Sequence, residues 1–344
     1  MENNFKHSQF AHCESGVIST LISSYGLKLS EPMAFGITST LSFVFIPLVK
    51  INGMPLIAYR DLPKNIVKKI SKVLNIKMNK KVYSNKEEAN DELTSLVNDG
   101  NLVGLQTSVF YLPYFPKDMR FHFNAHNLLV YGKENNDYLI SDPVFEEEVK
   151  CNENELNKAR FAKGAFAPKG FIYYPDEIPK DIDFSSIIKK AIKKNAKSML
   201  TPFPFAGVKG MNKLAKKIST LKRNNNDRFL KNYLTHIVRM QEEIGTGGGG
   251  FRFLYAAFLS ESKQYNLDEK ILDEASALLI KSGNTLREFA LLCVTASKNL
   301  DKFDAKVIAQ KLEEASSYEK EAFTLLKNGE TSLKEIYPIL INAN

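Results

Sequence analysis

Two kinds of apolar pattern run along this chain, and the change between them falls near residue 180. In the first part, stretches with the 3.6-residue period of a helix alternate with β-branched and aromatic stretches that are typical of strands. The first helix runs through Val17 and Tyr25 and ends near Gly26. Ser30 is the predicted N-cap of a second, short helix. Further helices are predicted over residues 63–74, 85–98 and 153–161.

The predicted strands include two hairpins. Residues 41–50 and 56–60 flank Asn52-Gly53, a dipeptide that favours a tight hairpin turn. Residues 124–133 and 138–142 flank a polar turn, and closure near Tyr131 and Asp137 would place His126 opposite Asp142, where side chains share a face. Single strands are expected at 77–83, 102–109 and 170–174, and an aromatic loop that lines a cleft is expected over 111–123.

After residue 183 only helical periodicity remains. The chain is therefore predicted to be α+β, with a first domain over 1–178 and an all-helical domain over 179–344, joined by a linker at Tyr174–Pro179. The predicted helices cover residues 184–200, 208–223, 227–244, 251–262, 267–282, 285–298, 304–327 and 331–341.

Composition narrows the class of protein. The 344 residues are 44% hydrophobic and 25% charged, enough for a sizeable core. Cys13, Cys151 and Cys293 are odd in number and far apart, so no disulfide framework or cysteine metal site is expected, and a reducing, cytoplasmic setting fits best. The N-terminus lacks the apolar core of a signal peptide, and no stretch is long and apolar enough to span a bilayer.

The net charge of +8 comes from one segment. Residues 187–226 hold eleven Lys or Arg and no Asp or Glu. Such a patch favours an acidic partner, which could be nucleic acid, a membrane surface or an acidic protein, and the alternative is a solvated helix face. The cations of its first helix include Lys189, Lys193, Lys194 and Lys197.

Three residues make a constellation for nucleophilic catalysis. Cys13 lies at the start of the first helix, where free amides and the helix dipole stabilise a thiolate. His126 would move protons, and Asp142 would hold the imidazole in the required tautomer. A nucleophile on a helix N-terminus with base and orienter on a later sheet is the papain-like arrangement. Taken singly, each residue also fits a structural role, as a core cysteine, a core histidine and a turn former.

The sequence resembles the butirosin biosynthesis protein H N-terminal family over its first 175 or so residues. The matching words are HCESGVISTLISSYGLKLSEPMAFGI, AHNLLVYG and DYLISDP, and the later EIGTGGGGFR resembles the helical domain usually fused to it. The resemblance implies a papain-like, cysteine-protease or transglutaminase-type fold and an acyltransferase. In such an enzyme Cys13 is acylated, His126 is the base and Asp142 orients it.

The resemblance also implies partners. An acyl or peptidyl carrier protein brings the acyl group as a phosphopantetheine thioester, and a small amine accepts it, in antibiotic or related specialised-metabolite biosynthesis. No bound cofactor, metal, nucleic acid or membrane is expected, and the oligomeric state is open, a homodimer being one possibility. Lys189, Lys193, Lys194 and Lys197 would dock the acidic carrier. Two other classes stay open: a peptidase or amidohydrolase that uses water as acceptor, and a non-catalytic carrier- or metabolite-binding protein.

Auxiliary residues are less certain from the sequence. Many papain-like enzymes place a Gln six residues before the cysteine as an oxyanion donor, whereas here His7 has that spacing and Gln9 is four before, so both are candidates. Gln106 is a further candidate to line the site, and Glu14 a candidate to recognise the amine. The glycine run is either a phosphate-binding loop for the pantetheine arm or a sharp turn; the binding candidates are Gly247, Gly248, Gly249, Gly250 and Arg252.

Overall fold

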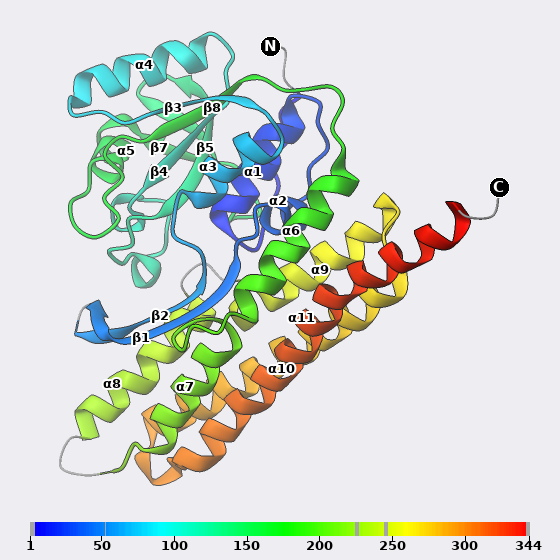
Figure 1. Ribbon diagram of the computed structural model, residues 1–344. Coiled ribbons are helices and arrows are strands. Elements are labelled where there is room, and N and C mark those ends of the chain that lie inside the picture. The colour runs from blue at the N-terminus through cyan, green and yellow to red at the C-terminus, as the bar shows by residue number, and fades with distance from the viewer. Residues whose placement is uncertain (1–3, 52, 224–226, 244–246, 342–344) are drawn as a thin grey trace. The chain divides into compact units, whose positions relative to one another are not determined.

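A computed structural model describes residues 4–51, 53–223, 227–243 and 247–341 (Figure 1). The chain divides into two compact units, and each is described by itself. The first unit holds the chain up to Ala34 together with Leu62–Ile182, and the second holds Phe35–Asp61 and the chain from Asp183. The sequence predicts two contiguous domains that meet at 178/179. The structure instead assigns the predicted hairpin of residues 41–60 to the helical unit.

The first unit contains a six-stranded sheet in which every neighbouring pair is antiparallel. Its order is β3-β8-β4-β5-β6-β7, so the strand expected at 77–83 does lie at an edge. One strand, β7, was not predicted, and β8 extends into the stretch interpreted as a linker. The bounds are β3 (Lys77–Lys81), β4 (Val103–Thr107), β5 (His126–Glu134), β6 (Asp137–Ser141), β7 (Val149–Asn152) and β8 (Ile172–Glu177).

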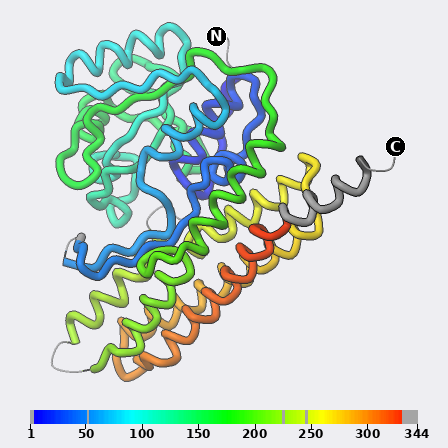
Figure 2. The backbone as a smooth tube through the Cα atoms, in the orientation of Figure 1, coloured from blue at the N-terminus to red at the C-terminus, as the bar shows by residue number. Residues whose placement is uncertain are grey.

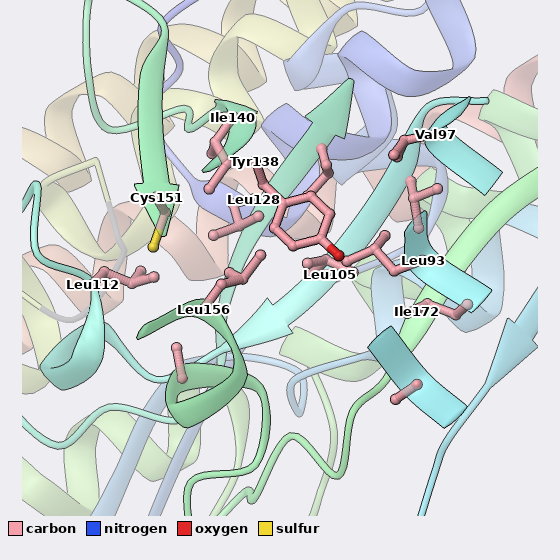
Figure 3. Close-up of a cluster of buried hydrophobic side chains, with 14 of the residues drawn as sticks. Leu93, Val97, Leu105, Leu112, Leu128, Tyr138, Ile140, Cys151, Leu156 and Ile172 are labelled. Carbon is pink, nitrogen blue, oxygen red and sulfur yellow. The ribbon is translucent and has the colours of Figure 1, made fainter. Parts of the chain in front are cut away.

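Helices cover both faces of this sheet. Helices α4 (Lys86–Asn98) and α5 (Glu153–Arg160) pack on the face of the sheet that carries Leu105 and Leu128. Figure 3 shows the cluster of buried side chains between this face and the two helices. Helix α1 (Cys13–Ser24) contacts β4, β5 and β8 but contributes no residue to that cluster, so it covers the other face. The remaining helices of the unit are α3 (Asn65–Val73) and the short 3₁₀ turns Val109–Tyr111 and Lys117–Met119. Helix α2 (Glu31–Ile37) begins after Ser30, whose hydroxyl accepts the Met33 amide at 3.1 Å as predicted.

The second unit joins a two-stranded hairpin to helices. Strands β1 (Leu41–Ile51) and β2 (Met54–Arg60) pair as predicted, and they contact α6, α7 and α8. Two pairs of predicted helices are single helices in the structure: residues 267–298 form α10 and residues 304–341 form α11, apart from their first residues. The long α10 and α11 run antiparallel side by side (Figure 2). The helices are α6 (Phe184–Met199), α7 (Gly207–Ser219), α8 (Asp227–Val238), α9 (Arg252–Ser262), α10 (Glu269–Lys298) and α11 (Ala305–Ile341).

Among the residues that the structure describes, no helix combines the length and the apolar character that crossing a bilayer requires.

A buried ion pair lies in the core of the helical unit. The Arg252 guanidinium donates to both carboxylate oxygens of Glu319, at 2.8 and 2.9 Å, and both side chains are fully buried. Ser282 donates to the same carboxylate at 2.8 Å, and Arg252 also donates to the Gly250 carbonyl at 2.6 Å. The bidentate geometry and the extra partners compensate for the removal of both charges from water.

Replacing one member of this pair should destabilise the protein strongly. Glu319→Ala leaves a buried guanidinium without its counter-charge, which typically costs about 3–5 kcal/mol of unfolding free energy. Urea denaturation measures the loss. The matched control is Glu321→Ala, an exposed position on the same helix, where a change within about 0.5 kcal/mol is expected. Equal losses in the two variants would contradict a structural role for the pair.

Candidate active site

The first turn of α1 is fixed by a buried carboxylate. Glu31 accepts hydrogen bonds from the amides of Ala11 and His12, at 3.0 and 2.7 Å, and from the Ser15 hydroxyl at 3.1 Å. The His12 ring is the N-cap and accepts the Ser15 amide at 3.3 Å. Burial raises the pKa of Glu31, and these three hydrogen bonds oppose the rise. The helix therefore begins at Cys13, as the sequence predicts.

Cys13, His126 and Asp142 lie together. The His126 Nε2 atom is 2.7 Å from Asp142 Oδ2, and the Cys13 side chain is close enough to the His126 ring to raise its pKa. The exposed fractions are 6%, 3% and 0% for Cys13, His126 and Asp142, so the whole constellation is shielded from bulk water. Since Nε2 bonds the carboxylate, Nδ1 is the nitrogen left for the thiol.

The strand register that brings His126 to Asp142 differs from the predicted one. The hairpin closes at Glu134 and Asp137, and Leu129 pairs with Ser141. Continuing that ladder by one step places Asp142 opposite Leu128, two residues from His126. The hairpin closes three residues further along β5 than predicted, and the register shift at Tyr131 takes back one of these residues. The hydrogen bond is thus a diagonal one, which long side chains can reach across a sheet.

Two more groups hold Asp142. The Tyr114 hydroxyl donates to Oδ2 at 2.9 Å, and the Val144 amide donates to Oδ1 at 3.0 Å. The ring of Phe115 meets the His126 ring edge-on, with 5.4 Å between centroids. Tyr114 was not singled out by sequence reasoning, although the aromatic loop that contains it was. Nothing in the local sequence distinguishes Tyr114 from the other aromatics of the loop.

His126 is strongly biased toward the protonated form. Burial alone would lower its pKa, but the charge and hydrogen bond of Asp142, followed by those of Cys13, raise the pKa to about 10. An imidazolium beside the sulfur stabilises negative charge on it. This geometry is compatible with the predicted roles of Cys13 as nucleophile, His126 as proton carrier and Asp142 as orienting carboxylate.

Both predicted oxyanion side chains have other partners. His7 bonds the Ser141 hydroxyl through Nδ1 at 2.7 Å and the Phe145 carbonyl through Nε2 at 3.2 Å. The Gln9 amide donates to the Val144 carbonyl at 3.0 Å. In the structure these two residues hold the segment on both sides of Asp142, and their role as oxyanion donors stays a prediction. The Cys13 amide is a better donor, because the first amides of a helix have no partner within it.

The glycine run is a packing turn. Gly247, Gly248, Gly249 and Gly250 all have positive φ, and so does Phe251. A Cβ on Gly250 would lie 2.4 Å from the Tyr59 ring. The Gly249 amide donates to the Glu242 carboxylate at 3.2 and 3.1 Å, so a side chain of the same chain occupies this donor. Gly245 and Thr246 lie outside the described residues.

Arg252 cannot serve as the predicted phosphate ligand, because it is fully buried and bound to Glu319. The prediction is therefore wrong for Arg252, and for Gly247–Gly250 it stays a prediction, with the Gly249 amide already bound by Glu242.

The prediction for Glu14 changes in the structure. Glu14 is fully buried, and its carboxylate accepts the Ile66 and Val67 amides at 2.9 and 3.4 Å, which caps α3 and leaves no role in amine recognition.

The two other cysteines are buried in apolar surroundings. Cys151 is part of the core cluster in Figure 3, and burial raises its pKa to about 12. Cys293 is buried in the helical unit. The described residues contain no group of three or more His, Cys, Asp or Glu placed to hold a metal ion.

The lysines proposed for docking lie on α6. Lys193, Lys194 and Lys197 are exposed, whereas Lys189 is half-buried. Asp183 caps this helix by accepting the Ser186 amide at 3.1 Å.

A cysteine at a helix N-terminus, with a histidine and an aspartate on later strands of an antiparallel sheet, is the papain-like arrangement that the sequence predicts, here in an α+β protein. Residues 12–143 match the family described as butirosin biosynthesis protein H, N-terminal, and residues 154–326 match the domain of unknown function DUF4872. The second match spans half of the chain, so the chain belongs to the DUF4872 family and carries a butirosin biosynthesis protein H-like N-terminal part. The resemblance seen in the sequence is thereby confirmed.

Solved structures give weaker likenesses. A C39-like peptidase from Bacillus anthracis is 15% identical, with 51% of this chain and 96% of that chain covered and a TM-score of 0.37. The peptidase domain of ComA from Streptococcus, a bi-functional ABC transporter involved in a quorum sensing pathway, is 13% identical, with 52% and 100% covered and a TM-score of 0.32. No curated protein matches the chain.

The His126 environment makes a testable prediction about titration. In the wild type, the His126 ring signal should titrate near pH 10 in an NMR experiment. Asp142→Asn removes the largest cause that raises this pKa, so the midpoint should fall by more than one pH unit. Asp137→Asn, at the other end of β6, is the control and should leave it unchanged. A wild-type midpoint near the ordinary 6.5, or no fall in Asp142→Asn, would contradict the geometry.

Proposed function

We propose that this protein is a cysteine acyltransferase, which moves an acyl or peptidyl group from a carrier-protein thioester to an amine. The observation that carries the proposal is the buried contact of Cys13 with His126, whose other nitrogen lies 2.7 Å from Asp142. The family match supports the reaction class, since its description names an antibiotic biosynthesis protein. Specialised-metabolite biosynthesis is accordingly the proposed setting.

In the first half-reaction, the Cys13 thiolate attacks the thioester carbonyl of the donor. The tetrahedral oxyanion faces the Cys13 amide at the helix N-terminus. Collapse breaks the bond between carbonyl carbon and carrier sulfur, and the His126 imidazolium gives its proton to the departing thiolate. The products are acyl-Cys13, neutral His126 and the free carrier thiol.

In the second half-reaction, an amine attacks the acyl-Cys13 carbonyl. Neutral His126 accepts the proton that the amine loses as its bond to carbon forms. Collapse then breaks the carbon–sulfur bond, so Cys13 leaves as a thiolate beside a protonated His126. The product is an amide, and the starting pair is restored. Asp142 holds the ring throughout and does not itself transfer a proton.

The exposed cations of α6 are the proposed docking surface for an acidic carrier protein. Lys193, Lys194 and Lys197 face solvent, with Lys189 half-buried beside them, and no carboxylate interrupts residues 187–226. A surface of one sign raises the encounter rate with an oppositely charged partner. Because oxidation of the thiolate would end the cycle, a reducing cytoplasmic setting is part of the proposal.

The test supplies acyl groups both on a carrier protein and on free pantetheine, with a panel of amines, and identifies products by mass spectrometry. Wild-type protein should form an amide and carry an acyl adduct on Cys13. Cys13→Ala should lose at least about a thousandfold in rate, since it removes the nucleophile. If the protein hydrolyses peptides or thioesters and forms no amide, it is a hydrolase and not an acyltransferase. Unchanged turnover in Cys13→Ala would refute covalent catalysis by Cys13.

The same assay tests docking. Lys193/Lys194/Lys197→Glu should slow transfer from the carrier-bound donor by about tenfold or more at low salt, and leave transfer from free pantetheine unchanged. Lys209/Lys213/Lys216→Glu on α7 is the control with the same charge change. Equal slowing of both donors, or of both variants, would remove α6 as the docking surface.

A further inference from the structure

The first unit has a cavity of about 410 Å³ that the catalytic constellation does not use. Its size falls in the range of small-molecule sites. The lining includes Lys64, Gln106, Gly164, Phe166 and Lys169.

The cavity walls are tied to the residues next to the catalytic ones. Gln106 precedes Thr107, which pairs with His126 in the β4–β5 ladder. Its amide donates to the carbonyl of Asn124 at 2.6 Å, two residues before His126. These contacts place one wall beside the strand that carries the base.

A second wall of the cavity, formed by Lys64, is connected to the start of α1 through α3. Lys64 is the N-cap of α3, and the first amides of that helix are held by Glu14, the residue after Cys13. Glu14 also exerts a favourable charge effect on Lys64, so the two groups are close in space. Through Glu14, the first turn of α3 and the Lys64 wall of the cavity are thus tied to the helix that begins at Cys13.

Gln106 presents an acceptor that the protein does not use. Its Nε2 donates to the carbonyls of Asn124 and Phe166, at 2.6 and 3.0 Å, which fixes the orientation of the amide. The side chain is 1% exposed, and Oε1 has no hydrogen-bond partner among the described residues. A buried acceptor of this kind is costly unless a ligand or water donates to it.

Two lysines supply the positive charge of the cavity. Lys64 is half-buried, with its ammonium 4.7 Å from the centre of the Phe171 ring and 3.5 Å from the Pro168 carbonyl. Burial lowers its pKa, and repulsion from Lys68 and Lys169 lowers it further. An anion between Lys64 and Lys169 would relieve that repulsion.

The backbone around the cavity is strained. Lys64, Phe166 and Lys169 have φ of +69°, +55° and +56°, values that residues with a Cβ adopt at a cost in free energy. Gly164 has a φ of +112°. Strain of this kind gathers at ligand sites, where it places side chains that an unstrained loop would not.

We propose that this cavity is an anion subsite for the acyl donor, in which Lys64 and Lys169 pair with a negatively charged group and Gln106 Oε1 accepts an adjacent N–H. The inference rests on the proposed acyl transfer for the identity of the ligand. The anion is either the phosphate of phosphopantetheine, whose arm carries amide N–H groups, or a carboxylate of an aminoacyl or peptidyl group. Both sources share this chemistry, and binding measurements distinguish them.

Calorimetry with the full-length Cys13→Ala protein measures binding without turnover. One pair of probes is phosphopantetheine and pantetheine, and the other is glutaryl-pantetheine and pentanoyl-pantetheine. The charged member of one pair should bind at least about fivefold more tightly than its neutral partner. The pair that shows the preference identifies the source of the anion.

Variants of the cavity residues then test which side chains cause the preference for the charged probe. Lys64→Gln and Lys169→Asn should each reduce it about fivefold, and Asn tolerates the positive φ of residue 169. Lys72→Gln on α3 and Lys163→Asn on the same loop as Lys169 remove equal charge outside the cavity lining and should leave it unchanged. Absence of binding by all four probes, no preference for either anion, or equal effects of lining and control variants would overturn the subsite.

Different results would contradict the anion subsite and the proposed acyl transfer. If the wild type forms amide but shows no anion preference, only the subsite is wrong. If anion binding depends on Lys64 and Lys169 but no donor is turned over, the cavity is a ligand site and the acyl-transfer proposal is wrong.

Discussion

The buried hydrogen bond between His126 and Asp142 is the interaction on which the site depends. Three groups converge on that carboxylate, from the imidazole, the Tyr114 hydroxyl and the Val144 amide, and together they compensate for its complete removal from water. The charge of Asp142 in turn keeps the ring protonated beside Cys13. Contacts made by His7 and Gln9 secure the segment on both sides of Asp142, so residues from the start of the chain help to hold this carboxylate in place.

Local features were predictable because short-range physics determines them. The start of α1 at Cys13, the Ser30 cap and the hairpin at Gly53 follow from spacing, capping and turn chemistry. The register of β5 and β6 was not, because the polar stretch between the two strands does not show where the turn closes, and the hairpin closes at Glu134 and Asp137 rather than at Tyr131 and Asp137. Histidine and aspartate still meet, because a diagonal pair lies within reach of their side chains.

Residue roles that depend on distant partners were the least predictable. In the sequence, Arg252 stands beside a glycine run, a pattern that is compatible with phosphate binding. In the structure, its guanidinium is paired with Glu319, which lies 67 positions later in the chain. Glu14 follows the nucleophile but caps a helix that begins at Asn65. In each case the tertiary fold supplies a partner that local pattern cannot show. Conversely, the cavity of Lys64 and Gln106 combines residues whose local sequence carries no motif.

The central claim is that Asp142 acts through His126 to activate Cys13. The most direct measurement is the rate at which iodoacetamide alkylates each cysteine between pH 6 and 9, followed by mass spectrometry in wild type and Asp142→Asn. Cys151 is an internal reference, because burial raises its pKa to about 12. The account predicts that Cys13 reacts at least about tenfold faster than Cys151 at pH 7 and loses most of that advantage in Asp142→Asn. Equal rates for Cys13 and Cys151, or a Cys13 rate unaffected by Asp142→Asn, would contradict it.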